Sequence, residues 1–182
     1  MTSATTAFEA SGVSAQNLLN DDQVADFVIN GYHIVEPQFP AEFHSQIYSD
    51  LEVLPTNPGD EINKAVPNID EIYEHPAVRG ALSSLLGADY SRAAHRHCHR
   101  NHPGTRSQVW HQDSLNIPTL DDGHGRVSDH VQSVLVMYYP QDVASNMGPT
   151  ALIPGSHLFT AAGDRNASHG NFRDQIVAVV PA

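Results

Sequence analysis

The amino-acid sequence predicts an α+β fold, or a mainly β barrel with an added layer of helices, and three observations support this prediction. Residues 20–87 carry apolar side chains at helical spacing, residues 91–180 carry short strand-like segments separated by turns, and there is no internal repeat. Helices followed by a run of strands are typical of such folds. We expect residues 1–19, rich in Ser, Thr and Ala, to form a flexible arm and residues 20–182 to form one domain.

The first expected helix has clear signals at both ends. Asn20 suits an N-cap, and Asp21 and Asp22 follow in the first turn, where the helix dipole favours negative charge. Gly31 suits the position just past the helix end. Residues 32–35 then predict a short strand.

Three further helix or loop segments follow. Pro40 suits the first turn of a helix, and Pro76 opens another that ends at Gly87, with a short helix expected at 68–74. Residues 57–67 are expected to form a loop. The apolar side chains expected to face the core are Phe43, Ile47, Leu51, Val78, Leu82, Leu85 and Leu86.

The second half of the chain predicts strands. They are expected at residues 91–101, 107–110, 131–139, 150–153 and 175–180. Residues 131–139 are apolar enough to be buried on both faces. Turns are expected at residues 101–104, 140–148 and 154–156.

Composition excludes several classes of partner. The formal net charge is −12, and the nine basic residues comprise Lys64 and eight arginines, so neither nucleic acid nor an anionic membrane is an expected partner. Cys98 is the only cysteine, which excludes an internal disulfide and agrees with a reducing compartment. No secretory signal and no apolar run of about 20 residues is visible, so we expect a cytoplasmic protein.

A candidate metal site lies at the end of the expected strand 107–110. In a strand, residues i and i+2 point to the same face, so His111 and Asp113 can hold one ion together while Gln112 points away. Two histidines and one carboxylate form the ligand set of non-haem Fe(II) oxygenases. On spacing alone, a polar turn at a strand end explains the same residues.

Other residues near this pair have alternative interpretations. His95, His97 and His99 alternate along one expected strand, and a polar strand face explains them better than a metal site, because two-residue spacing does not fold three rings around one ion. Trp110 suits either the wall of a pocket or the core.

Three motifs, taken in order, resemble the phytanoyl-CoA dioxygenase family. They are DQVADFVINGYHIV at residues 22–35, His111-Gln112-Asp113, and NMGPTALIPGSH at residues 146–157. The resemblance implies a double-stranded β-helix (jelly-roll, cupin-like) core flanked by N-terminal helices. It also implies Fe(II) as cofactor and 2-oxoglutarate as co-substrate, with O2 and a small organic molecule as the other substrates.

The same resemblance assigns roles to individual residues. His111 and Asp113 match the first two iron ligands, and Gln108 and Gln112 are candidates for contact with 2-oxoglutarate. Related halogenases carry a small residue in place of the carboxylate, so Asp113 favours hydroxylation. The segment at 146–157 matches a structural turn rather than a ligand position.

The sequence departs from the family pattern near its end. The third ligand, a distal His, and the Arg that pairs with 2-oxoglutarate have no match before Ala182; His157 and His169 are the internal candidates for the ligand. We therefore expect a chain that lacks the closing strands of the barrel and is inactive alone. Two alternatives remain: a non-catalytic jelly-roll binding module, and a cupin-type metalloenzyme that does not use 2-oxoglutarate. Substrate specificity would come from loops at 57–67, 118–129 and 158–172.

Overall fold

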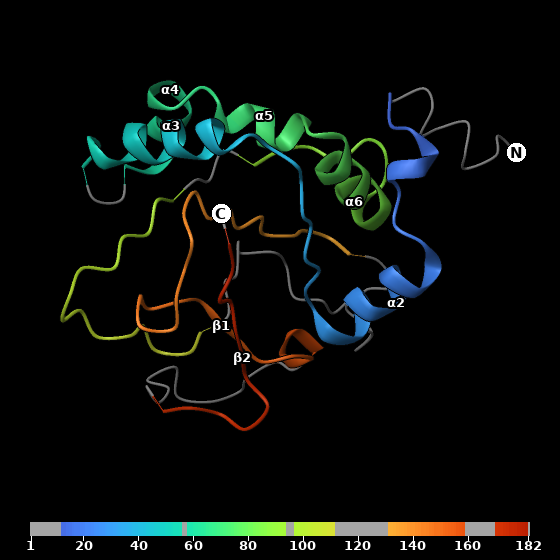
Figure 1. The fold of residues 1–182 in the computed structure, drawn as a ribbon. Helices are drawn as coiled ribbons and strands as arrows, with labels where there is room; N and C mark the ends of the chain where they lie inside the picture. Colours follow the sequence, from blue (N-terminus) through green and yellow to red (C-terminus); the bar gives the residue numbers. More distant parts are fainter. Residues whose placement is uncertain (1–11, 56–57, 94–96, 112–130, 159–169, 182) are drawn as a thin grey trace, which may run out of the picture.

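The computed structural model describes residues 12–55, 58–93, 97–111, 131–158 and 170–181. Helices α3 to α6 form a row along one side of the molecule, while α2 lies to one side and a small sheet lies below the row among long extended segments (Figure 1). The elements are η1 (Ala15–Asn17), α2 (Asp21–Asn30), α3 (Ala41–Glu52), η2 (Gly59–Glu61), α4 (Ile62–Ala65), α5 (Ile69–Glu74), α6 (Pro76–Leu86), β1 (Ala151–Leu152), η3 (Ser156–Leu158) and β2 (Ile176–Val177).

Helix α2 begins and ends where the sequence predicts. The Asn20 side chain accepts a hydrogen bond from the Gln23 N–H at 2.9 Å, and the Gln23 side chain accepts one from the Asn20 N–H at 3.0 Å, which completes a capping box. At the other end Gly31 adopts φ +82°, a left-handed conformation, and its N–H donates to the Phe27 carbonyl at 2.7 Å. Local polar chemistry therefore fixes both boundaries.

The core lies under α3. Its buried members are Ile47, Ile62, Val66 and Ile72, and the partly buried side chains packed against them are Phe39, Phe43, Leu51, Leu54, Ile69, Cys98 and Tyr138. The predicted apolar face of α3 is confirmed. The expected loop at 57–67 is wrong in part, because η2 and α4 lie within it and bury Ile62 and Val66. The prolines and polar residues of this segment indicated a loop, whereas Ile62 and Val66, four positions apart, lie on one side of a helical turn.

Helix α6 packs against the residues before α2. The predicted range is confirmed, with Pro76 in the first turn and Val78 and Leu82 buried. The Leu19 N–H donates to Ser84 Oγ at 2.9 Å, and Gly80 lies directly against the backbone of Asn17. Residues 12–19, the described part of the expected arm, are therefore packed on α6.

The sheet is antiparallel and small. Its pairs are Ala151 with Val177 and Leu152 with Ile176, and an isolated bridge joins Val143 to Val180. The expected strands at 150–153 and 175–180 are confirmed as shorter elements. In the described part of the chain the sheet has two strands, so the jelly-roll core is not visible there.

Four other expected strands are wrong for the residues that the structure describes. They are 32–35, 91–101, 107–110 and 131–139. Their backbones take part in no ladder among the described residues, and a strand is defined by its partner as much as by its own sequence. Residues 131–139 are also not buried on both faces, because Leu135 is 65% exposed and Met137 is 45% exposed.

Candidate metal site

The segment that carries His111 follows a turn at 101–104. Gly104 adopts φ +82°, and the Thr105 N–H donates to the His102 carbonyl at 3.0 Å, as the sequence predicts for a turn. The Asn101 side chain donates to the Gly148 carbonyl at 2.7 Å. The turn is thus attached to the segment that leads into β1.

His111 is exposed and its ring is oriented by its own backbone. Its Nδ1 lies 2.8 Å from the carbonyl oxygen of Val109, and only a protonated Nδ1 can donate to that oxygen. Nδ1 is therefore the donor in this hydrogen bond, and a metal ion would bind the ring through Nε2. A neutral imidazole held in this tautomer has the donor chemistry of a metal ligand that binds through Nε2.

The structure describes only one of the other residues of the predicted site. Asp113 and Gln112 lie outside the described residues, so the expected pairing of His111 with Asp113 stays a prediction. Gln108 is exposed, three residues before His111. Among the residues that the structure describes, no three His, Cys, Asp or Glu side chains come together to hold a metal.

His157, an internal candidate for the third ligand, is hydrogen-bonded to the backbone of α2. Its Nε2–H donates to the Val28 carbonyl at 2.9 Å, and the Gly155 N–H donates to the Asn30 carbonyl at 2.9 Å. Both acceptors belong to the last turn of α2, whose carbonyls have no partner within the helix. The turn at 154–156 therefore caps α2, which is a structural role for His157. His169, the other internal candidate, lies outside the described residues.

The alternating histidines are placed only in part. His95 lies outside the described residues, while His97 and His99 are exposed and their rings stack with centroids 5.8 Å apart. The shared face of residues i and i+2 is therefore retained although no strand forms there.

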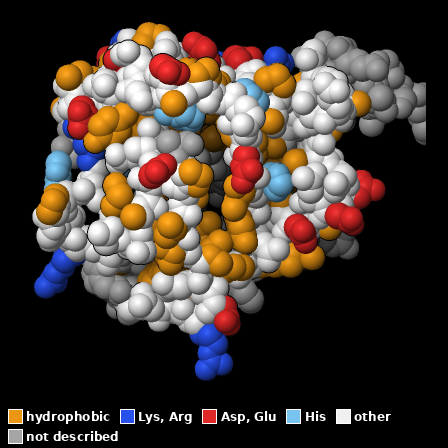
Figure 2. All heavy atoms as spheres, viewed as in Figure 1, with side chains coloured by type: hydrophobic (Ala, Val, Ile, Leu, Met, Phe, Trp, Pro, Cys, Tyr) orange, Lys and Arg blue, Asp and Glu red, His pale blue; other side chains and the backbone are white. Residues whose placement is uncertain are grey.

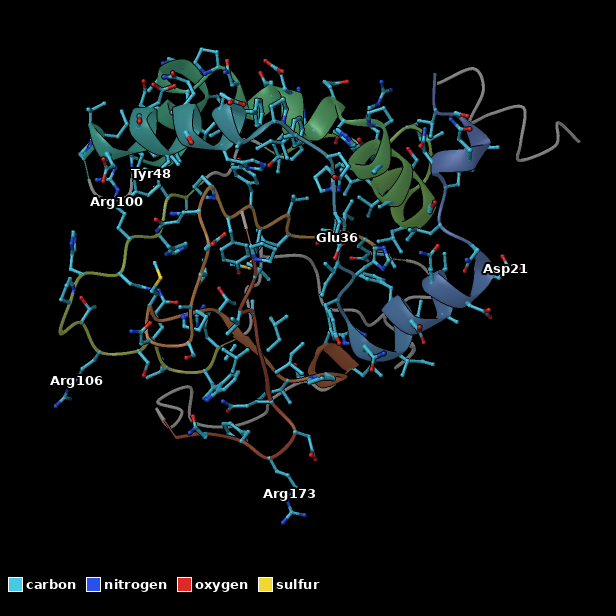
Figure 3. The ribbon with its side chains drawn as sticks, viewed as in Figure 1. Asp21, Glu36, Tyr48, Arg100, Arg106 and Arg173 are labelled. Carbon is cyan, nitrogen blue, oxygen red and sulfur yellow. The ribbon has the colours of Figure 1, made fainter. Side chains whose placement is uncertain are left out.

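Trp110 lies next to His111 and contacts a segment that is distant in the sequence. Its indole N–H donates to the Gly170 carbonyl at 2.8 Å, and its ring meets the Phe172 ring edge to face, with centroids 5.3 Å apart. Arg106 and Arg173, near the two contacting segments, both project away from the body of the molecule (Figure 3). Trp110 is thus half-buried in a small aromatic contact and does not reach the central core.

The sequence did not predict a groove beside α3. It has a volume of about 510 Å³, and its lining includes Phe39, His44, Tyr48 and Gln141. His44 Nδ1 lies 2.8 Å from the hydroxyl of Tyr138, whose pKa burial raises to about 12, so that phenol keeps its proton. These two residues are 94 positions apart, and no local pattern in the sequence points to their contact.

Outside the candidate site, two further features concern a tyrosine on α3 and the exposed hydrophobic side chains. Tyr48 of α3 lies near Arg100 (Figure 3), and a hydrogen bond to Glu52 raises the pKa of Tyr48. Hydrophobic side chains are exposed over much of the face seen in Figure 2. No helix in the described ranges is both long enough and apolar enough to cross a membrane.

Comparison with known proteins gives one match. A family model described as phytanoyl-CoA dioxygenase matches residues 13–175, most of the chain. No curated protein matches the sequence, and no solved structure matches the fold. The match covers both the helical half and the segment that carries His111.

Proposed function

The chain belongs to the phytanoyl-CoA dioxygenase family, and on that premise we propose that it is an Fe(II)- and 2-oxoglutarate-dependent dioxygenase that hydroxylates a small organic substrate. The family as a whole comprises Fe(II)- and 2-oxoglutarate-dependent oxygenases with a cupin or jelly-roll fold, acting with O2 on small molecules. The reaction, the ligands and a cytoplasmic location for this chain are the parts that we propose.

The observation that carries this proposal is the hydrogen bond from His111 Nδ1 to the Val109 carbonyl. It supports a role for Nε2 as an iron ligand, because a ring that donates from Nδ1 would bind a metal through Nε2. The carboxylate of Asp113 would be the second ligand and would offset part of the charge of the ion. Gln108 and Gln112 would contact 2-oxoglutarate.

In this proposal the cofactor and co-substrate would supply the reactivity, and the protein would hold them in place. When bound, the iron and 2-oxoglutarate supply activation of O2 and oxidation of a C–H bond. The residues of the chain would hold the ligands in place: the Val109 carbonyl accepts a hydrogen bond from Nδ1 of His111, and the carboxylate of Asp113 would bind the ion beside it. Trp110 would exclude water from one side of the segment. The loops at 57–67, 118–129 and 158–172 would select the substrate.

Anaerobic spectroscopy tests the proposal. Addition of Fe(II) and then 2-oxoglutarate is expected to produce a visible charge-transfer band, which His111→Ala and Asp113→Ala should each abolish. His102→Ala is the matched control, since His102 is exposed on the same segment and contributes only its backbone carbonyl to the turn. That variant should keep the band.

The other outcomes separate the alternatives. Bound metal without any response to 2-oxoglutarate would favour a cupin-type metalloenzyme. The absence of metal binding would favour a non-catalytic binding module. A band that survives His111→Ala would remove His111 from the ligand set.

A further inference from the structure

Trp110 is the only tryptophan of the chain, and two contacts attach it to residues 60 and 62 positions further on. One is the hydrogen bond from its indole N–H to the Gly170 carbonyl at 2.8 Å. The other is the edge-to-face contact with Phe172, a geometry that adds to the stabilisation from buried area. Both partners precede β2, so the indole links the segment 109–111 to the chain that enters the sheet.

The position of Trp110 matters because of its neighbours on both sides. Val109 supplies the carbonyl that orients the His111 ring, and the peptide groups of Trp110 connect that carbonyl to His111. Successive side chains of an extended segment point in opposite directions. The indole is held by two contacts and the imidazole projects from the next residue, so these contacts restrain the backbone that carries His111.

We infer that Trp110 is a positioning residue for the metal ligand His111 and that Phe172 is its partner in this role; the inference rests on the proposed function. Trp110 touches neither the metal nor the substrate in this role. Groups that orient a ligand affect metal binding about 10- to 100-fold when removed, because the ligand must then be ordered at the moment of binding. The contacts of Trp110 with Gly170 and Phe172 extend that support to a part of the chain that is far from the ligands in sequence.

Cobalt(II) titration under anaerobic conditions measures the effect without any turnover. Co(II) has visible absorption that reports its ligands, so the dissociation constant can be followed directly. Trp110→Phe keeps an aromatic ring but removes the N–H, and Phe172→Ala removes the ring partner. Each is expected to weaken Co(II) binding about tenfold. The double variant should be weaker by less than the product of the two effects, because the two substitutions remove two contacts that restrain the same side chain.

Matched controls come from the same two segments. Arg106→Ala and Arg173→Ala remove exposed side chains that project away from the molecule in Figure 3, so neither should change the Co(II) dissociation constant. Fluorescence of the single tryptophan adds an independent reading in Phe172→Ala, where emission should shift to longer wavelength. Phe172→Leu replaces Phe172→Ala if the latter unfolds, since it keeps most of the volume.

The results distinguish the inference from the proposed function. If His111→Ala abolishes Co(II) binding while Trp110→Phe and the Phe172 variant lower only the urea midpoint, Trp110 is merely structural and the inference is wrong. If His111→Ala leaves Co(II) binding unchanged, the proposed site itself is wrong. Weaker Co(II) binding in both aromatic variants, with unchanged binding in both arginine controls, supports the positioning role.

Discussion

Sequence patterns predict the secondary structure of the first, helical half of this protein better than that of its second half. Helices α2, α3, α5 and α6 lie where residues 20–87 predict them, whereas none of the three strands expected between 91 and 139 is formed among the described residues. A helix satisfies its hydrogen bonds within itself, and its caps are a few residues away. A strand needs a second segment to pair with, and the residues of the strand do not identify that segment.

The burial of single side chains shows the same contrast. Ile47 on α3 is fully buried, while Leu135, in the most apolar segment of the chain, is 65% exposed. Both belong to runs that the sequence marks as apolar. Only the first packs into the core, because Ile62 of α4, Val66 just after α4 and Ile72 of α5 surround it.

Truncation of these two side chains is expected to give the largest difference. Ile47→Ala should lower the free energy of unfolding by about 2–5 kcal/mol, because it leaves a cavity in the core. Leu135→Ala, the matched change at an exposed site, should change it by no more than about 0.5 kcal/mol. Urea denaturation followed by far-ultraviolet circular dichroism measures both. Equal losses would mean that Leu135 is buried in solution and that the contrast between the halves is wrong.

The contact of η3 with α2 gives the next largest effect. Gly31 has φ +82°, and a Cβ there would overlap the His157 ring, so Gly31→Ala should cost about 1–2 kcal/mol for the backbone and about 1 kcal/mol more for the displaced hydrogen bond to Val28. Gly104 has the same φ with open space around it, so Gly104→Ala should cost only the first amount. Thermal unfolding of the two variants compares them. A cost at Gly31 no greater than that at Gly104 would show that His157 does not lie against α2.

Some of these features were readable in the sequence and others were not. The N-cap at Asn20 and the glycine at Gly31 act within four residues, so the residue types alone predict them, whereas the second bond of the capping box, from Asn20 N–H to Gln23, was found only in the structure. The segments at 150–153 and 175–180 were recognisable as strands, but their register was not. Pairing of Ala151 with Val177 depends on how the intervening chain returns, which propensity does not encode.

The candidate site shows the same difference between local features and long-range contacts. His111 stands out from the sequence through its spacing to Asp113 and its place in the family motif, but the hydrogen bond that sets its tautomer depends on the backbone path through Val109. The partner of Trp110 is 62 positions away at Phe172 and carries no signal of its own. The residues that hold a ligand are therefore harder to predict than the ligand.

Tyr138 joins the two halves, and its titration tests that junction with the smallest expected effect. Its ring packs against the core under α3 and its hydroxyl bonds to His44, so burial raises its pKa from 10.0 to about 12. Between these values the folded protein keeps a proton that the unfolded chain releases. The contribution of Tyr138 to stability is therefore complete below pH 10.0 and is lost as the pH rises through about 12.

The urea midpoint of the wild-type protein should fall across this alkaline range, and Tyr138→Phe should reduce the slope of that fall. A smaller slope should remain, because hydrogen bonding to Glu52 and burial also raise the pKa of Tyr48 and of Tyr90, respectively. Tyr138 is only half-buried, so solvent screening keeps the change small. Identical slopes in the two proteins would mean that the phenol is solvated, and that the second half of the chain does not pack on the helical core at this residue.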